Sequence, residues 1–200
     1  MAGNPSDTPH DRRAMFRLGL KRLVAPLAEF IEQRLPAVET AGTATAREVL
    51  RPPGALPEPE FLARCYRCGN CVEVCPAKAI HPVNRQNIER AGTPYIDPDL
   101  AACTLCDQLA CMKACPSGAL QVIGDKRQIK MGTAAVDRRL CLRRSSSLCT
   151  ICLDTCPIGR EAIDISDGGE LQVNPMACVG CGTCQYNCPV RPRAIRVVPR

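Results

Sequence analysis

Apolar residues recur at helical spacing near the start of the chain. Between residues 11 and 35 they stand three or four positions apart, with charged side chains between them, which predicts an amphipathic helical segment. Pro26 is expected to kink this helix or to begin a second one. We expect the apolar stripe to dock on the rest of the protein or on a partner, with a membrane surface as the alternative. The apolar positions are Phe16, Leu20, Leu23, Val24, Leu27, Phe30 and Ile31.

The segments on either side of this helix differ from it in composition. Residues 1–10 are small, polar and contain proline, so we predict that they are disordered. Residues 36–57 are rich in Ala, Thr and Pro and are predicted to form a linker. The remaining residues, 58–200, are expected to form the main domain. No apolar run approaches the ~18 residues of a membrane span, so we expect no transmembrane helix.

Short alternating runs of apolar and polar residues within 58–200 predict β-strands. Residues 59–64 are instead expected to form a short helix. We expect the strand that ends one unit to pair as a hairpin with the strand that begins the next, with turns near Gly124 and Gly168-Gly169. The predicted strands lie at residues 95–97, 119–123, 135–137, 162–165, 171–174 and 194–198.

The same region holds all sixteen cysteines, in four groups that repeat at a nearly fixed interval. Their first cysteines are 38, 38 and 37 residues apart, and each group ends in Cys-Pro. A fixed period indicates duplicated units. We predict an α+β fold of tandem bacterial-ferredoxin-like modules, built of short hairpins, cysteine loops and short helices, stabilised by metal and preceded by the N-terminal helix. The groups are Cys65-x2-Cys68-x2-Cys71-x3-Cys75, Cys103-x2-Cys106-x4-Cys111-x3-Cys115, Cys141-x7-Cys149-x2-Cys152-x3-Cys156 and Cys178-x2-Cys181-x2-Cys184-x3-Cys188.

This spacing is typical of iron–sulfur clusters. In the tight form of the motif, three cysteines bind one [4Fe–4S] cluster and the fourth binds another. Zinc also takes four thiolates, but zinc ribbons use two separated pairs of cysteines. Disulfides are disfavoured because cysteines so close in sequence make poor partners for one another. We therefore predict that all sixteen cysteines are ligands of four [4Fe–4S] clusters.

Composition and charge narrow the function further. Aromatic residues make up 3% of the chain and tryptophan is absent, so the clusters are expected to contribute much of the folding free energy. The formal net charge of the chain is +6. A [4Fe–4S] core in its 2+ state with four thiolates carries about −2, so four such clusters would bring the net charge of the loaded protein to about −2. The basic surplus thus compensates the clusters, and nucleic-acid binding is not expected.

Three functions remain open on these residues. The first is an electron-transfer protein, whose clusters carry the chemistry and which needs no catalytic residue of its own. The second is a non-redox accessory or maturation factor for an oxidoreductase, in which clusters serve only to hold the fold. The third is a catalytic redox subunit, but we find no dinucleotide-binding or phosphate-binding loop and no cysteine outside the four groups. We expect an electron carrier and not an enzyme.

From about residue 58 onward the chain resembles the four-cluster ferredoxin-type proteins of the periplasmic nitrate reductase and methylamine utilisation systems (the NapG and MauM types). The resemblance is carried by the run from Cys65 to Pro76, the widened third group that ends at Pro157, and the fourth group with the final Ala194–Arg200. It implies an electron relay between a membrane-bound, quinol-oxidising partner and a terminal oxidoreductase.

The spacing leaves two pairings of the groups open. In the sequential pairing, group one shares its clusters with two, and three with four; in the nested pairing, one goes with four, and two with three. The same order of motifs in electron-transfer subunits of molybdopterin oxidoreductases implies the nested pairing. Its clusters are held by Cys65, Cys68, Cys71 and Cys188; by Cys75, Cys178, Cys181 and Cys184; by Cys103, Cys106, Cys111 and Cys156; and by Cys115, Cys141, Cys149 and Cys152.

The N-terminal sequence also bears on the compartment. Arg12-Arg13 and the four residues after them resemble a twin-arginine export signal. An apolar stretch of ~7–15 residues should follow such a signal, whereas Leu23 to Ala28 is short and interrupted by Pro26. We therefore expect a cytoplasmic protein, with periplasmic export as the alternative.

Overall fold

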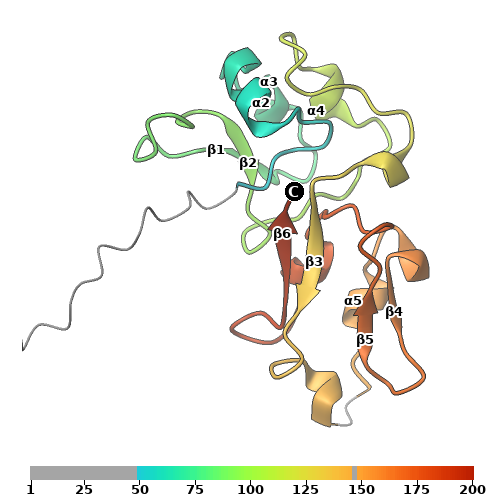
Figure 1. Cartoon of the computed structure of the whole chain (residues 1–200). Helices are drawn as coiled ribbons and strands as arrows, with labels where there is room; N and C mark the ends of the chain where they lie inside the picture. The colour runs from blue at the N-terminus through green and yellow to red at the C-terminus, as the bar shows by residue number, and fades with distance from the viewer. Residues whose placement is uncertain (1–48, 146–147) are drawn as a thin grey trace, which may run out of the picture. The chain divides into compact units, whose positions relative to one another are not determined.

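The computed structural model describes residues 49–145 and 148–200, whose course is drawn in Figure 1. The features predicted for residues 1–10, for the helical segment 11–35, for the twin-arginine motif and for most of the linker lie outside the described residues. These features therefore stay predictions, as does the cytoplasmic location. Within the described part of the chain, no helix is both long and apolar enough to cross a membrane.

The first module, residues 49–131, places short helices around a hairpin. Its longest helix, α2, follows Pro57 and confirms the helix predicted over 59–64. Phe61 on this helix is 0% exposed and anchors the module's apolar core. The elements are α2 (Glu58–Arg64), α3 (Asn70–Glu73), β1 (Ile80–Pro82), β2 (Pro94–Ile96), α4 (Ala110–Lys113) and the 3₁₀ helix Lys126–Gln128.

The second module, residues 132–200, repeats this plan with longer outer strands. Ile163 and Ile195 are buried in its own apolar core, together with Leu171. The elements are β3 (Gly132–Val136), the 3₁₀ helix Leu142–Ser145, α5 (Ile151–Asp154), the 3₁₀ helix Gly159–Glu161, β4 (Ile163–Ile165), β5 (Leu171–Val173), α6 (Thr183–Asn187) and β6 (Ile195–Pro199).

Each module contains an inner hairpin between its two cysteine groups. β1 pairs antiparallel with β2, and β4 pairs antiparallel with β5. The turn of the second hairpin includes Gly169, whose φ of +78° suits glycine. Hairpins that join the end of one unit to the start of the next are therefore confirmed at these two places, although β1 itself lies outside the predicted strands.

The third expected hairpin, across Gly124, is wrong. Of the predicted strand 119–123, only Leu120 forms a bridge, and its partner is Ala55 at the start of the module. β3 pairs instead with β6, with Val136 opposite Ile195, and the two lie side by side in Figure 1. The chain thus closes each module on itself, because the segment before its first cysteine group pairs with the segment after its second.

The end of the predicted linker is also corrected. Residues 49–57 pack into the first module, where Leu50 is 5% and Arg51 7% exposed. The carbonyl of Leu50 accepts a hydrogen bond from the backbone N–H of Ile96 (2.8 Å). Proline and alanine in this segment therefore serve packing and strand pairing, and the main domain begins before residue 58.

The two modules meet through backbone and side-chain contacts. The backbone N–H of Met131 donates to the carbonyl of Val179 (3.1 Å). The buried guanidinium of Arg193 pairs with Asp99 across the boundary (3.3 Å). Both contacts lie beside cysteine loops, so the modules join where their predicted cluster ligands are.

Candidate metal centres

The cysteines of each group take equivalent places on the local backbone. The third cysteine lies in a one-turn helix, and the fourth follows within two residues of that helix's end. Because the fourth cysteine lies beyond the helix, its sulfur is free to serve a different site. The third cysteines are Cys71 in α3, Cys111 in α4, Cys152 in α5 and Cys184 in α6.

Left-handed backbone shapes the loops of groups one, two and four. It occurs at the second residue after the first cysteine and at the second residue before the third. These turns let sulfurs two or more residues apart point to the same side of the loop. The third group, with its seven-residue gap, shows no positive φ at its described loop residues and contains the 3₁₀ helix Leu142–Ser145. The left-handed residues are Arg67, Leu105 and Gly180, and Gly69, Leu109 and Gly182.

The structure gathers the sulfurs into four sites of four cysteines each. Sites A, B and D are the cysteines that line three cavities, of which the one at site A measures about 270 Å³. Site C is defined by the thiols that raise the pKa of Cys152. Site A is Cys65, Cys68, Cys71 and Cys115; site B is Cys75, Cys103, Cys106 and Cys111; site C is Cys141, Cys149, Cys152 and Cys188; site D is Cys156, Cys178, Cys181 and Cys184.

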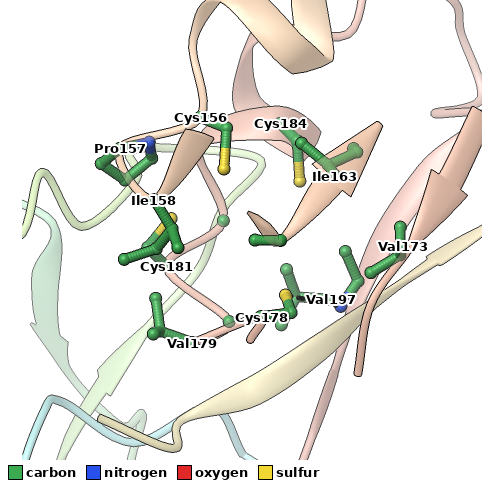
Figure 2. A pocket seen from close by; sticks show the side chains of 14 residues that line it. Cys156, Pro157, Ile158, Ile163, Val173, Cys178, Val179, Cys181, Cys184 and Val197 are labelled. Atoms are coloured by element: carbon green, nitrogen blue, oxygen red, sulfur yellow. Dashed lines mark hydrogen bonds between the residues drawn. The ribbon is translucent and has the colours of Figure 1, made fainter. Parts of the chain in front are cut away.

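Figure 2 shows site D from close by. The sulfurs of Cys156, Cys178, Cys181 and Cys184 surround a small cavity that apolar side chains close off. Such a dry lining keeps water from a bound cluster. The apolar residues labelled there are Ile158, Ile163, Val173, Val179 and Val197.

This grouping corrects the nested pairing. That arrangement requires Cys188 beside Cys65, whereas the structure places Cys188 beside Cys152. Likewise Cys115, and not Cys188, lines the cavity of site A. The physical reason is the closure of each module by its outer strands, which keeps groups one and two together and groups three and four together. The sequential alternative is the one that the structure follows.

Burial and mutual repulsion oppose ionisation of six of the sixteen thiols. Burial, reinforced by neighbouring cysteines, raises the pKa of Cys71 and of Cys152 to about 12. Burial also raises the pKa of Cys103 to about 12 and that of Cys111 to about 11. Several thiolates can share one such site only when the positive charge of a bound cation or cluster compensates their charge.

Backbone hydrogen bonds to sulfur are present at the fourth cysteines of groups one and two. The backbone N–H of Ala79 donates to Sγ of Cys75, and that of Leu120 donates to Sγ of Cys115, both at 3.4 Å. At Cys115, burial alone would raise the pKa, but the Ser117 hydroxyl and backbone N–H groups outweigh it and lower the pKa. These donors favour the thiolate, the form that binds iron.

Two hydroxyl groups beside the sites were not anticipated from the sequence. Ser117 Oγ lies 3.5 Å from Cys115 Sγ, and Thr183 Oγ1 lies 3.4 Å from Cys181 Sγ. Each hydroxyl residue is the second residue after a cysteine. A Ser or Thr at this position is the sequence feature from which a contact with the cysteine sulfur could have been predicted. The donor set fits [4Fe–4S] clusters, because each site offers four soft sulfur ligands contributed by two groups.

Comparison with known proteins agrees with this geometry. A family model described as a 4Fe-4S dicluster domain matches residues 64–119 and again residues 147–191, one match in each module. The methylamine utilization ferredoxin-type protein MauM of Methylophilus methylotrophus is 41% identical, over 95% of this chain and 87% of its own length. The ferredoxin-type protein NapG of Escherichia coli is 37% identical, over 75% of this chain and 70% of its own length.

The chain belongs to the MauM and NapG family of ferredoxin-type iron–sulfur proteins. The similarity to MauM of Methylorubrum extorquens, at 41% identity over 82% of this chain, agrees with this assignment. The resemblance found in the sequence is thereby confirmed, and so is a fold made of ferredoxin-like 4Fe-4S domains. The first match encloses groups one and two, and the second covers group four and the last three cysteines of group three, which agrees with the pairing of sites A with B and of C with D.

Proposed function

We propose that this protein is an electron carrier that binds one [4Fe–4S] cluster at each of sites A, B, C and D and relays electrons between a donor and an oxidoreductase partner. The observation that carries the proposal is the crossed arrangement of ligands. In each module, three cysteines of one group meet the fourth cysteine of the other group, which holds two clusters close together. A bound cluster supplies reversible one-electron transfer, and the protein supplies ligands, burial and hydrogen bonds.

Electrostatic interactions between cysteines of different sites indicate the order of the sites along the molecule. Cys71 of site A has Cys111 of site B among its neighbouring thiols. Cys184 of site D likewise has Cys152 of site C near it. Between the modules, Cys103 of site B neighbours Cys181 of site D. We infer the order A–B–D–C, in which electrons cross between the modules from B to D or in the reverse direction.

Site A is the end that reaches the surface most openly. Cys68 is exposed, and the adjacent Tyr66 is 72% exposed. Arg67, between them, donates hydrogen bonds to the carbonyls of Glu89 and Ala91, which holds the β1–β2 connection beside the site. We propose that a redox partner docks at this surface, because electron transfer between proteins needs a cluster close to the interface.

The relatives' names suggest the class of partner. MauM is named for methylamine utilization. We propose that the partner of this protein is an oxidoreductase of a comparable respiratory or amine-oxidising system, with a quinol-linked, membrane-bound protein on the other side of the relay.

Anaerobic reconstitution tests the proposal. We expect about four iron and four sulfide per site, and a broad thiolate-to-iron absorption band that dithionite bleaches and air or a mild oxidant restores. Tightly bound zinc without acid-labile sulfide would contradict the cofactor. Clusters that assemble but show no reversible reduction would instead favour the accessory or maturation function.

A further inference from the structure

Thr183 lies where the two modules meet. Its Oγ1 is 3.4 Å from Sγ of Cys181, a site D cysteine, and 3.4 Å from the backbone carbonyl oxygen of Cys103, a site B cysteine. The backbone N–H of Cys103 in turn donates to the carbonyl of Cys181 (3.0 Å). A single hydroxyl group therefore contacts one cysteine of each of the two sites that face each other across the module boundary.

The number of protons available for hydrogen bonding at this contact changes when a cluster binds at site D. A threonine hydroxyl has one proton to donate and lone pairs to accept. While Cys181 is a thiol, its S–H can donate to Oγ1, and the hydroxyl can donate to the carbonyl of Cys103. Iron-bound Cys181 is a thiolate without a proton, so its contact with Thr183 is a hydrogen bond only when the hydroxyl is the donor. The sulfur and the carbonyl then compete for one proton.

The charge on the sulfur decides that competition. Adding one electron to the cluster increases the negative charge on its thiolates, and a more negative acceptor makes a stronger hydrogen bond. A hydrogen bond that is stronger in the reduced state stabilises that state and raises the reduction potential. The half-buried position of Thr183 limits competition from water.

We propose that Thr183 is the residue that sets the potential of site D relative to site B. Its hydroxyl donates to Cys181 Sγ when site D is reduced and to the Cys103 carbonyl when site D is oxidised. The proposal rests on the proposed function, because it requires a cluster at site D. It makes the middle step of the relay depend on one side chain that binds no iron itself.

Ser117 provides a matched control in the first module. Its Oγ makes the corresponding contact with Cys115 at site A (3.5 Å), and it accepts a hydrogen bond from the backbone N–H of Ala119 (3.3 Å). A change at Ser117 should therefore shift the potential of site A and leave site D unchanged. Comparing the variants at Ser117 and Thr183 therefore separates a local effect on the potential of one cluster from a general loss of protein stability.

The experiment is a potentiometric titration of the reconstituted full chain, followed by electron paramagnetic resonance. Thr183→Val keeps the shape and removes the hydroxyl, and we expect it to move one midpoint to a more negative value while the other midpoints stay in place. Thr183→Ser keeps the hydroxyl and should restore that midpoint toward the wild-type value. Ser117→Ala should lower a different midpoint.

Exchange into deuterated water gives a second measurement that needs no variant. Backbone N–H groups also donate to site D sulfurs, as Ala134 does to Sγ of Cys178 (3.4 Å), so the exchange is kept brief and labels the hydroxyl before the slowly exchanging backbone groups. The reduced site D signal should then couple to one deuteron, and the absence of this coupling refutes the proposal even if Thr183→Val does not load site D.

The outcomes separate this proposal from the proposed function. If iron and sulfide fall short of four clusters in the wild-type protein, the proposed function fails. If the wild-type protein carries four reducible clusters but Thr183→Val leaves every midpoint unchanged, only the role of Thr183 is refuted. The same holds if Thr183→Ser shifts the midpoint as far as Thr183→Val does.

Discussion

Single side chains outside the cysteine groups do much to hold the first module together, and Arg51 is the main example. Its guanidinium is buried and pairs with Glu58 at 2.7 Å. The same group donates to the carbonyl of Pro94 (2.7 Å) and lies 4.6 Å from the centre of the Phe61 ring. Burial alone would raise the pKa of Glu58, but the hydrogen bonds and charges of Arg51 and Arg90 outweigh it and lower the pKa.

Glu58→Gln should therefore destabilise the loaded protein. The variant leaves a buried guanidinium with a weaker partner, and we expect it to lose about 1–3 kcal/mol of unfolding free energy. Urea unfolding, followed by the loss of cluster absorbance, measures this. The pKa of Glu58 in the folded protein lies below its ordinary value of 4.5. The stabilising contribution of its charge is therefore complete above about pH 4.5 and is lost as the pH falls through the folded-state pKa. The difference in unfolding free energy between the wild-type protein and Glu58→Gln should therefore shrink as the pH falls below about 4.5.

Glu60→Gln is the control for this prediction. Glu60 pairs with Arg64 on the same helix, and both side chains are about half exposed. An exposed pair of this kind contributes about 0.3–0.5 kcal/mol. If Glu60→Gln lowers the unfolding free energy as much as Glu58→Gln does, burial of Arg51 is not the cause of the destabilisation.

At the level of elements, the loop of the fourth cysteine group packs tightly against the strand that begins the second module. A Cβ on Gly180 would overlap the backbone of Gly132 in β3, and Gly180 has φ of +74°. Glycine is therefore required at position 180 for two reasons: there is no space for a Cβ atom, and the backbone conformation is one that other residues rarely adopt. The fit holds Cys178 and Cys181, on either side of Gly180, against the sheet.

Gly180→Ala should disrupt site D. Overpacking costs about 1–3 kcal/mol, and the unfavourable φ adds to it. We expect lower iron content and a lower midpoint of thermal unfolding, read from cluster absorbance. Gly124→Ala is the matched control, because a Cβ at Gly124 meets nothing within 4 Å and its φ is not positive. Equal losses in both variants would contradict the packing argument.

The sequence predicted the local elements better than their long-range pairing. The β4–β5 hairpin follows from two short alternating runs near each other in the chain, so its pairing could be predicted from local patterns. In the β1–β2 hairpin only the second strand was predicted, because Pro82 interrupts the short run that forms β1. The β3–β6 sheet joins Val136 to Ile195, and no local pattern distinguishes that partner from residues 119–123. Residues 49–57 were missed because proline and alanine resemble a linker in composition while their burial depends on the rest of the fold.

The pairing of cysteine groups is a consequence of these outer strands, and Cys75 tests it. In the structure, Cys75 lies with Cys103, Cys106 and Cys111 in site B. Serine replaces a soft sulfur with a harder oxygen, so Cys75→Ser should alter the same cluster signals as Cys106→Ser. Electron paramagnetic resonance of the reduced variants makes the comparison. A spectrum like that of Cys181→Ser would restore the nested pairing.

At the scale of the whole described region, two modules of the same plan meet through their cysteine loops. Arg193 and Asp99 pair across the boundary, and Cys103 donates its N–H to Cys181. The sequence predicted the repeat of four cysteine groups, and the role of all sixteen cysteines as cluster ligands stays a prediction. It did not predict that sites B and D face each other, because that depends on how the modules pack and not on spacing within a group.

The order A–B–D–C makes a prediction about distances between clusters. Magnetic coupling falls steeply with distance, so reduced pairs A with B, B with D, and D with C should couple, whereas A and C should couple least. Pulsed electron paramagnetic resonance on partly reduced protein measures these couplings, and Cys→Ser variants at Cys68, Cys106, Cys149 and Cys184 assign one signal to each site. Arg193→Met removes a charged contact between the modules and a hydrogen bond to the carbonyl of Cys188 in site C, and it should weaken the coupling between B and D while leaving that between A and B in place. A strong coupling between A and C, or a B–D coupling weaker than that between A and D, would show that electrons cannot follow the order inferred from Cys103 and Cys181.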